Sequence, residues 1–209
     1  MIIKEIIKSI WRFPIRQYYK NKLKNHNFTL ISANCIGGGY YHDTYQQFLS
    51  PTINLTVSNF ISFVERLDYY LGLEMLDGGI NKSGHPVGLL DDVSVCGVHY
   101  PSFVALAQKW NERKSRVNFS NLFIIVTEEF IKTNEDKNRF DNINYPKVCF
   151  VSRKEDVEYN WQVYLPGYEQ CEQLGDSMTY CDVLGRRVNE KYFDFIYFLN
   201  NKQIKARGK

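Results

Sequence analysis

The stretch FTLISANCIGGG, residues 28–39, decides the fold class. Its first six residues form a short apolar run of the length of a buried strand, and a glycine-rich segment follows at once. Residues 40–48 then have helical potential. A strand that enters a glycine-rich turn before a helix is a common opening of an α/β domain, and we predict that arrangement here.

The rest of the chain continues the alternation of strands and helices. Strands are predicted at residues 52–57, 86–90, 93–99, 122–127 and 146–152, and helices at 59–71 with Ser58 as the N-cap and after a second cap at Ser102. Residues 192–199 form a closing apolar element, and 164–185 is the least predictable stretch. The pattern predicts an α/β fold: a layered sheet with mainly parallel central strands flanked by helices.

Length and composition favour a single folded domain with two basic ends. The chain has 209 residues, of which 44% are hydrophobic and 15% aromatic, which excludes a disordered protein. We divide it into an N-terminal arm at residues 1–26, an α/β domain at 27–201 and a tail at 202–209. The net charge of +3 combines +6 in residues 1–25 and +4 in 202–209 with −7 in between.

Several classes of protein are excluded by what the sequence lacks. No apolar run approaches the roughly 20 residues of a membrane-spanning helix, and the N-terminus lacks the pattern of a secretory signal. Five cysteines, an odd number without CxxC spacing, favour a reducing cytoplasm. Histidines and cysteines are not spaced as zinc ligands, so no structural zinc site is expected, and the cofactor is unknown.

The N-terminal arm has the pattern of a basic amphipathic helix. Lysine or arginine occurs at every fourth position of residues 4–20, which places these cations on one stripe, and isoleucines and Trp11 lie mainly off it. Such a segment is typical of a helix that lies on an anionic membrane surface. On this hypothesis the protein is cytoplasmic and binds peripherally to the inner face of the membrane. The alternative is an ordinary helix packed on the domain by its isoleucine face. Nucleic acid is not expected as a partner, because the core is acidic.

The segment after the first strand is the leading candidate site. Open α/β sheets bind ligands at the carboxyl ends of their strands, which is where Asn34 and Cys35 are expected. Gly37 and Gly38 would turn backbone N–H groups toward an anion or oxyanion. Cys35 is either a nucleophile or part of the wall of a binding site, with His42 as a candidate base. A buried cysteine in a tight turn is the alternative without function.

A second group of candidates follows the later predicted strands. Asp91 and Asp92 are placed to orient a histidine or hold a cation, or they belong to a solvated turn. His99 ends the next strand, close to a helix with several cations, a combination that suits a phosphorylated or carboxylated ligand. The ligand-binding candidates in this part are Tyr100, Trp110 and Arg113.

These motifs resemble a known family. The segments ISANCIGG at 31–38, SPTINL at 50–55, PVGLLDDV at 86–93, HY at 99–100, KWNER at 109–113 and NLF at 121–123 occur in this order. Together they resemble a bacterial family of unknown function labelled exopolysaccharide biosynthesis protein, over about residues 28–155. The resemblance implies a role in capsule, exopolysaccharide or surface-glycan assembly, and it carries over no catalytic residue.

The resulting hypotheses share a pathway and differ in chemistry. The first is a transferase that acts on a glycan or lipid-linked sugar intermediate, with an acyl group as the favoured cargo, Cys35, His42, Asp91 and His99 as catalytic candidates, and glycosyl transfer as the alternative. The other is a noncatalytic accessory protein that binds glycans or recruits enzymes to the membrane.

Overall fold

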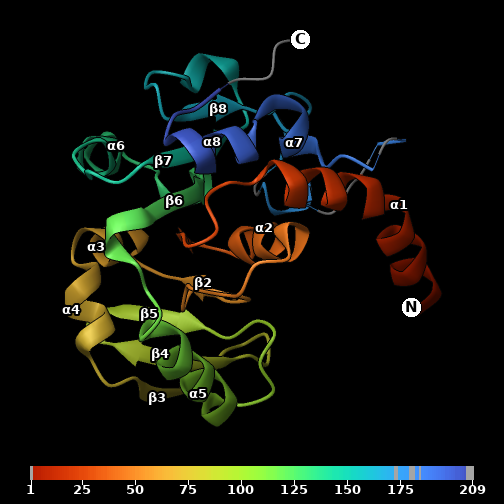
Figure 1. Ribbon diagram of the computed structural model, residues 1–209. Helices are drawn as coiled ribbons and strands as arrows, with labels where there is room; N and C mark the ends of the chain where they lie inside the picture. Colours follow the sequence, from red (N-terminus) through yellow and green to blue (C-terminus); the bar gives the residue numbers. More distant parts are fainter. Residues whose placement is uncertain (1, 172–173, 179–181, 184, 206–209) are drawn as a thin grey trace.

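The computed structural model shows a mixed α/β domain built from two four-stranded sheets (Figure 1). It describes residues 2–171, 174–178, 182–183 and 185–205, and of residues 2–9, 175 and 176 the backbone alone. The α/β prediction is confirmed. Among the described residues, no helix combines the length and apolar character that a membrane crossing requires.

The first sheet is parallel throughout. Its strands are β1 (Thr29–Ser32), β6 (Leu122–Thr127), β7 (Lys147–Val151) and β8 (Gln162–Tyr164), hydrogen-bonded in that order. Every residue of β6 is buried, as the apolar run predicts. Successive side chains point to opposite faces, so Ile124 and Val126 join one hydrophobic cluster while Phe123 and Ile125 join another.

Helices cover one face of this sheet. The helices α1 (Ile2–Lys22), α2 (Ile36–Thr44), α7 (Val188–Tyr192) and α8 (Phe195–Asn201) gather on the same side, so early and late segments of the sequence lie together over this face (Figure 1). Tyr40 of α2 stacks on Phe195 of α8 with 3.7 Å between ring centroids. This side of the core is therefore built from residues near both termini.

The second sheet is antiparallel, which the sequence analysis did not anticipate. Its strands are β2 (Thr56–Val57), β5 (Val93–Cys96), β4 (Pro86–Leu90) and β3 (Leu76–Ile80), in that order. Leu90 pairs with Val93, so two residues alone connect β4 to β5. Such a short link joins only antiparallel strands. The sheets and the remaining α-helices, α3 (Phe60–Glu65), α4 (Leu67–Gly72), α5 (Phe103–Lys114) and α6 (Asn134–Asp141), enclose the first cluster.

Several boundaries differ from the prediction. Ser102 caps α5 as expected, its side chain accepting from the amide of Ala105 at 3.3 Å. The helix predicted at 59–71 breaks at Arg66, and its N-cap is Asn59 rather than Ser58. Single turns of 3-10 helix occupy Phe119–Asn121, Glu128–Phe130, Lys154–Asp156 and Gly175–Met178.

Helix α1 is part of the domain and packs with the opposite orientation to the one predicted. It continues through Pro14 and packs against α2. Arg12 is only 4% exposed, whereas Ile10 and Trp11 are exposed. The basic stripe fails as a membrane-facing surface at Arg12 and Arg16, because acidic groups of the core attract both guanidinium groups inward.

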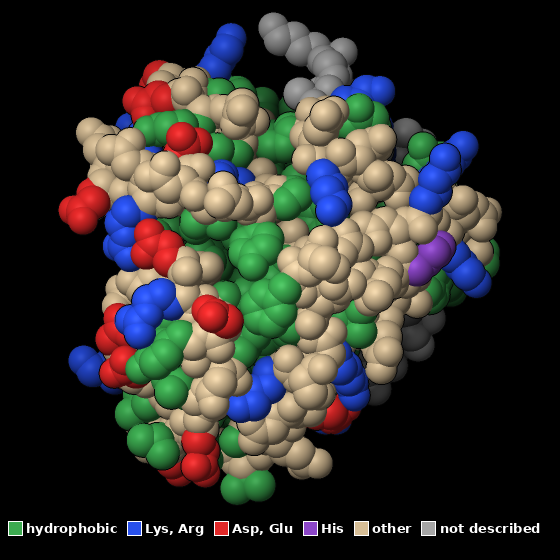
Figure 2. All heavy atoms as spheres, turned by 60° about the vertical axis from the view of Figure 1, so that its left-hand side comes forward, with side chains coloured by type: hydrophobic (Ala, Val, Ile, Leu, Met, Phe, Trp, Pro, Cys, Tyr) green, Lys and Arg blue, Asp and Glu red, His purple; other side chains and the backbone are tan. Residues whose placement is uncertain are grey.

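The charges on the outer surface are mixed in sign. On the face drawn in Figure 2, acidic and basic side chains are interspersed to the left of a central group of hydrophobic side chains, and mainly basic ones lie to its right. One exposed ion pair joins Arg139 of α6 to Glu65 of α3 at 2.6 Å. Exposed pairs of this kind contribute little to stability, on the order of 0–1 kcal/mol.

Candidate functional site

A pocket of about 630 Å³ lies at the carboxyl edge of the parallel sheet, between the two sheets. This is the edge at which open α/β sheets bind ligands. Residues from both sheets, α2 and the C-terminal region line it: Asn34, Cys35, Ile36, Gly39, Thr56, Val57, Ser58, Ser94, Cys96, Glu129, Phe130, Met178 and Arg187. The predicted position of Asn34 and Cys35 is therefore confirmed.

The glycines after Cys35 form the first turn of α2 rather than a free loop. Asn34 accepts from the amide of Ile36 through Oδ1 at 3.1 Å, and the Ser32 hydroxyl accepts from the amide of Gly37 at 3.3 Å. These two N–H groups are thus already occupied, which weakens the predicted oxyanion site. A Cβ at Gly37 would lie 2.6 Å from Ser32 Oγ, and one at Gly38 would lie 2.9 Å from Asn54 Oδ1. Close packing explains both glycines.

Cys35 is the N-cap residue of α2 and is partly buried. Burial raises the pKa of its thiol, and the nearby Cys96 raises it further. The nucleophilic form of cysteine is the thiolate, which a raised pKa disfavours at neutral pH. These surroundings favour Cys35 as part of the pocket wall over Cys35 as an activated nucleophile.

Glu129 is the acidic side chain of the pocket. It follows β6 directly, in the short helical turn Glu128–Phe130. Its Oε2 is buried and has no hydrogen-bond partner among the described residues. Burial raises the pKa of this carboxyl, although the Thr127 hydroxyl partly offsets the rise. A partly buried acid with a raised pKa in the lining of a pocket is suited to take a proton from a bound ligand.

The neighbouring Glu128 has a different role. Its Oε2 accepts from the backbone amide of Ser152 at 3.0 Å, which ties the end of β6 to the end of β7. Asn34 donates to Thr127 Oγ1 at 3.0 Å and ties β6 to the start of α2 in the same way. The polar groups around Glu129 are therefore held in place by bonds to their own neighbours.

Arg187 brings a positive charge to the lining of the pocket. Its Nη1 lies 2.8 Å from Asp43 Oδ2, and its side chain is 12% exposed. Arg12 binds the same Asp43 at 2.5 Å and Glu190 at 2.8 Å. Burial lowers the pKa of Arg12, but the bonds to Glu190 and Asp43 outweigh this effect and raise it. The cluster fixes Arg187 between the core and the pocket.

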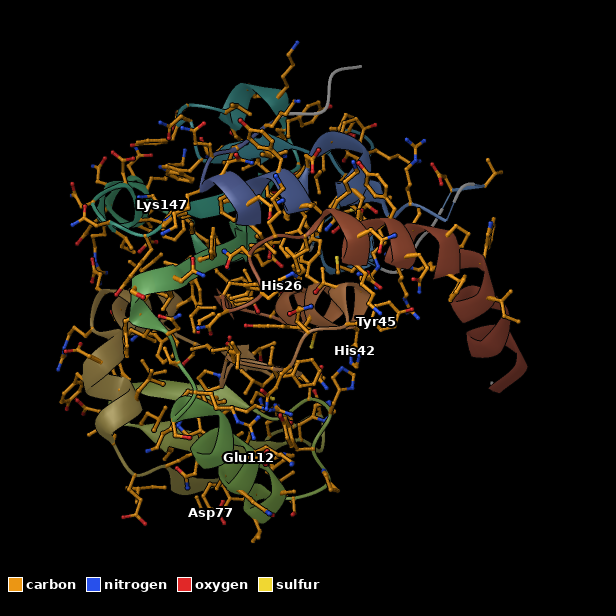
Figure 3. The ribbon with its side chains drawn as sticks, in the orientation of Figure 1. His26, His42, Tyr45, Asp77, Glu112 and Lys147 are labelled. Carbon is orange, nitrogen blue, oxygen red and sulfur yellow. The ribbon has the colours of Figure 1, made fainter. Side chains whose placement is uncertain are left out.

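The other predicted catalytic residues lie elsewhere, so the proposed constellation is not assembled. His42 is exposed near the C-terminal end of α2, beside Tyr45 (Figure 3), and its ring packs against Phe48. Asp91 accepts from Tyr69 at 2.9 Å at the exposed hairpin turn. His99 is exposed in the turn after β5. None of the three lines the pocket that contains Cys35.

The predicted ligand-binding residues of the later strands serve the structure. Asp92 accepts from Tyr70 at 2.6 Å in the hairpin turn. Tyr100 donates to the carbonyl of Ile53 at 2.8 Å and accepts from Arg113 at 2.6 Å. Trp110 is 1% exposed in the first hydrophobic cluster. These residues attach α5 and the hairpin to the core instead of lining the pocket.

Sequence reasoning missed both charged residues of the pocket. Glu129 follows a strand that was correctly predicted, so the carboxyl-edge rule applied to Asn34 would also have found it. Arg187 lies near the C-terminal end of the predicted domain, and no motif in the neighbouring sequence indicates that it lines a pocket. Among the described residues, no group of three or more His, Cys, Asp and Glu side chains is arranged as metal ligands.

The fold and the pocket define an α/β protein with a ligand-sized cavity between a parallel and an antiparallel sheet. The chain belongs to the family described as "Domain of unknown function (DUF1919)", which it matches over residues 6–200. A protein of Haemophilus influenzae, named only "Uncharacterized protein", is 31% identical over 201 residues, covering 95% of this chain and 97% of that protein. The family match includes most of α1, whereas the sequence resemblance began only at residue 28.

Proposed function

We propose that this protein is an acyltransferase of bacterial surface-glycan assembly and that Glu129 is its general base. The observation that carries the proposal is Glu129, which lines the pocket and whose buried Oε2 has no hydrogen-bond partner among the described residues. The pathway rests on the family resemblance of the sequence motifs. The cavity of about 630 Å³ has room for a sugar residue together with the reactive end of an acyl donor.

The chemistry follows from the position of the carboxylate. Glu129 accepts the proton of a sugar hydroxyl, and the hydroxyl oxygen attacks the carbonyl carbon of an acyl thioester. The carbon–sulfur bond then breaks, and the departing thiolate takes the proton from Glu129, which returns it to its starting state. General-base catalysis of this kind contributes about 10²–10⁴ in rate. The scheme needs no thiolate at Cys35, in agreement with its raised pKa.

Glycosyl transfer is the weaker alternative. Its support in the sequence was the pair Asp91 and Asp92, which bond to Tyr69 and Tyr70 at the exposed hairpin turn instead of facing the pocket. A noncatalytic protein that binds glycans would use the same pocket. The experiment below separates it from the transferase.

The test is a transfer assay with the Glu129→Gln variant, which keeps the shape of the side chain and removes its basicity. Purified wild type is incubated with radiolabelled acetyl-coenzyme A and lipid-linked saccharides from a strain that lacks the protein. We expect a loss of about 10²–10⁴ in acyl transfer for the variant. Glu135→Gln, an exposed position on α6, is the matched control and should retain full activity.

Three results would contradict the proposal. Equal rates for wild type and Glu129→Gln would exclude Glu129 as the base. Binding of the saccharides by wild type without any transfer would favour the noncatalytic accessory, and a transferred sugar in place of an acyl group would favour glycosyl transfer.

A further inference from the structure

The outer side of α1 carries apolar side chains that the core does not use. Ile10 is 69% exposed, Phe13 55% and Trp11 45%, while Arg12 between them is 4% exposed. Around residues 10–13 the usual amphipathic pattern is therefore reversed, with Arg12 inward and the hydrophobic side chains outward, whereas Tyr19 farther along the helix is buried in the core. The reason is the buried carboxylate of Asp43, which Arg12 neutralises.

The apolar surface extends beyond the helix and is bordered by cations. Trp11 donates through its indole nitrogen to the carbonyl of Val183 at 2.9 Å, and the side chain of Val183 is 82% exposed. Farther along, Lys20, Lys22 and Lys24 are exposed. The N-terminal half of α1 reaches past the body of the protein (Figure 1), so bulky partners have access to it.

A second copy of the chain or a lipid surface could cover these apolar side chains, and the size of the exposed apolar area distinguishes the two. The side chains of Ile10, Trp11 and Phe13 expose on the order of 300–400 Å². A stable interface between two proteins buries about 800 Å² on each partner, so this surface is small for a second copy of the chain. A lipid surface needs only a few apolar side chains, a tryptophan at the polar boundary and cations near the headgroups.

We propose that the outer side of α1 inserts into the headgroup region of an anionic membrane, with Ile10, Trp11 and Phe13 in contact with lipid and Lys20, Lys22 and Lys24 near the phosphates. This differs from the sequence hypothesis, in which the basic stripe itself met the membrane. Arg12 and Arg16 hold the helix on the domain through Asp43, and the apolar side chains make the lipid contact. In the sequence, isoleucines at positions 3, 6 and 7 precede Ile10 at helical spacing.

The test is sedimentation of the full-length protein with vesicles of phosphatidylcholine alone and of phosphatidylcholine mixed with phosphatidylglycerol. We expect wild type to bind the mixed vesicles, and the Ile10→Asp, Phe13→Asp double variant to lose at least about tenfold in partition coefficient. Trp110 and Trp161 are 1% and 3% exposed, so a blue shift of tryptophan fluorescence on binding would report Trp11. The Trp11→Phe variant should lose that shift.

The controls address charge and folding. Val104→Asp with Val157→Asp introduces the same charges at exposed apolar positions on other elements and should leave binding unchanged. Replacing Lys20, Lys22 and Lys24 by glutamine should weaken binding to the mixed vesicles and reduce its dependence on salt. Circular dichroism of each variant shows whether the fold is kept.

Any of three results would overturn the inference. The first is that wild type does not sediment with the mixed vesicles. The second is that the Ile10→Asp, Phe13→Asp variant binds them as well as wild type does. The third is that wild type forms a dimer in solution and the double variant does not, which would identify a second copy of the chain as the partner of the apolar surface of α1. None of these measurements depends on the proposed transfer activity.

Discussion

Two acids close to the same pocket, the buried Asp43 and the partly buried Glu129, have opposite surroundings. Asp43 on α2 has a side chain with 0% exposure, and three guanidinium groups contact it: Arg12 at 2.5 Å, Arg187 at 2.8 Å and Arg16 at 3.0 Å. Glu129 after β6 has one buried oxygen without a hydrogen-bond partner among the described residues. Arg187 belongs to both regions, because it binds Asp43 and lines the pocket.

The contrast separates structural acids from functional ones. A buried charge that is fully compensated holds the elements around it together, and removing one partner leaves the others uncompensated. A buried polar atom without a partner costs stability, so its persistence calls for a reason outside the folded core. On this basis Asp43 fixes the architecture and Glu129 is available for a ligand.

The largest effect is expected at Asp43. Asp43→Asn leaves three arginines facing a neutral side chain, and Glu190 alone cannot neutralise them. We expect a loss of about 3–5 kcal/mol in the free energy of unfolding, measured by urea denaturation at neutral pH. Asp77→Asn, at an exposed position of β3, is the control and should change it by less than about 0.5 kcal/mol. If Asp43→Asn lowered the free energy of unfolding by less than about 1 kcal/mol, Asp43 would not have the structural role that distinguishes it from Glu129.

The second prediction concerns stability as a function of pH at Glu129. The folded state raises the pKa of this carboxyl above its usual 4.5, so the folded protein binds the proton more tightly than the unfolded chain. Wild type therefore loses stability relative to Glu129→Gln as the pH rises from 4.5 toward the raised pKa, and the difference is constant above it. Urea denaturation of both proteins from acid to neutral pH measures this. A difference that does not depend on pH would show that the folded state does not raise the pKa of Glu129.

The third prediction extends the comparison to the thiols. Cys171 is exposed, Cys35 is partly buried with a raised pKa, and Cys149 is buried with a strongly raised one. We expect iodoacetamide to modify Cys171 first, Cys35 more slowly and Cys149 only on unfolding. Peptide mass spectrometry over a time course gives the order. Modification of Cys35 before Cys171 would indicate an activated thiolate and restore the nucleophile hypothesis.

The smallest effect is expected at the hairpin turn. Asp91 has a positive φ of 57° and a hydrogen bond to Tyr69, both at the surface. Asparagine tolerates this left-handed conformation. Asp91→Asn should therefore change the free energy of unfolding by no more than about 0.5 kcal/mol and leave transfer unaffected. A loss of transfer in this variant would show that the hairpin turn takes part in the reaction.

Much of the fold could be predicted because its signals are local. The apolar run of β6 and the serine cap of α5 each lie within a few residues and were assigned correctly. The antiparallel sheet was missed because β3 has the sequence LDGGI and is exposed throughout, so it lacks the apolar alternation of a strand. The hairpin of β4 and β5 could have been predicted, because only two residues separate these strands in the sequence.

The site could be predicted only at its first strand. Asn34 and Cys35 follow β1 in the chain, which makes their position a local property. The orientation of α1 depends on Arg12 meeting Asp43 and Glu190, which are 31 and 178 residues away, and no periodic pattern in the sequence reports those contacts. The cations of α1 do occur at every fourth position of the sequence, but Arg12 and Arg16 bind Asp43 in the core instead of facing outward.

The meeting of the two chain ends has a consequence for the order of folding. Arg12 bonds to Glu190, Asn25 donates to the carbonyl of Leu199, and the amide of Lys24 donates to Asn200. A ribosome synthesises the first helix long before these partners exist. The first helix can therefore reach its native position only after Glu190, Leu199 and Asn200 have been synthesised, and until then the carboxylate of Asp43 and the arginines of the first helix lack part of their final surroundings. Closure of this domain is a late event, and contacts of such long sequence separation are slow to form.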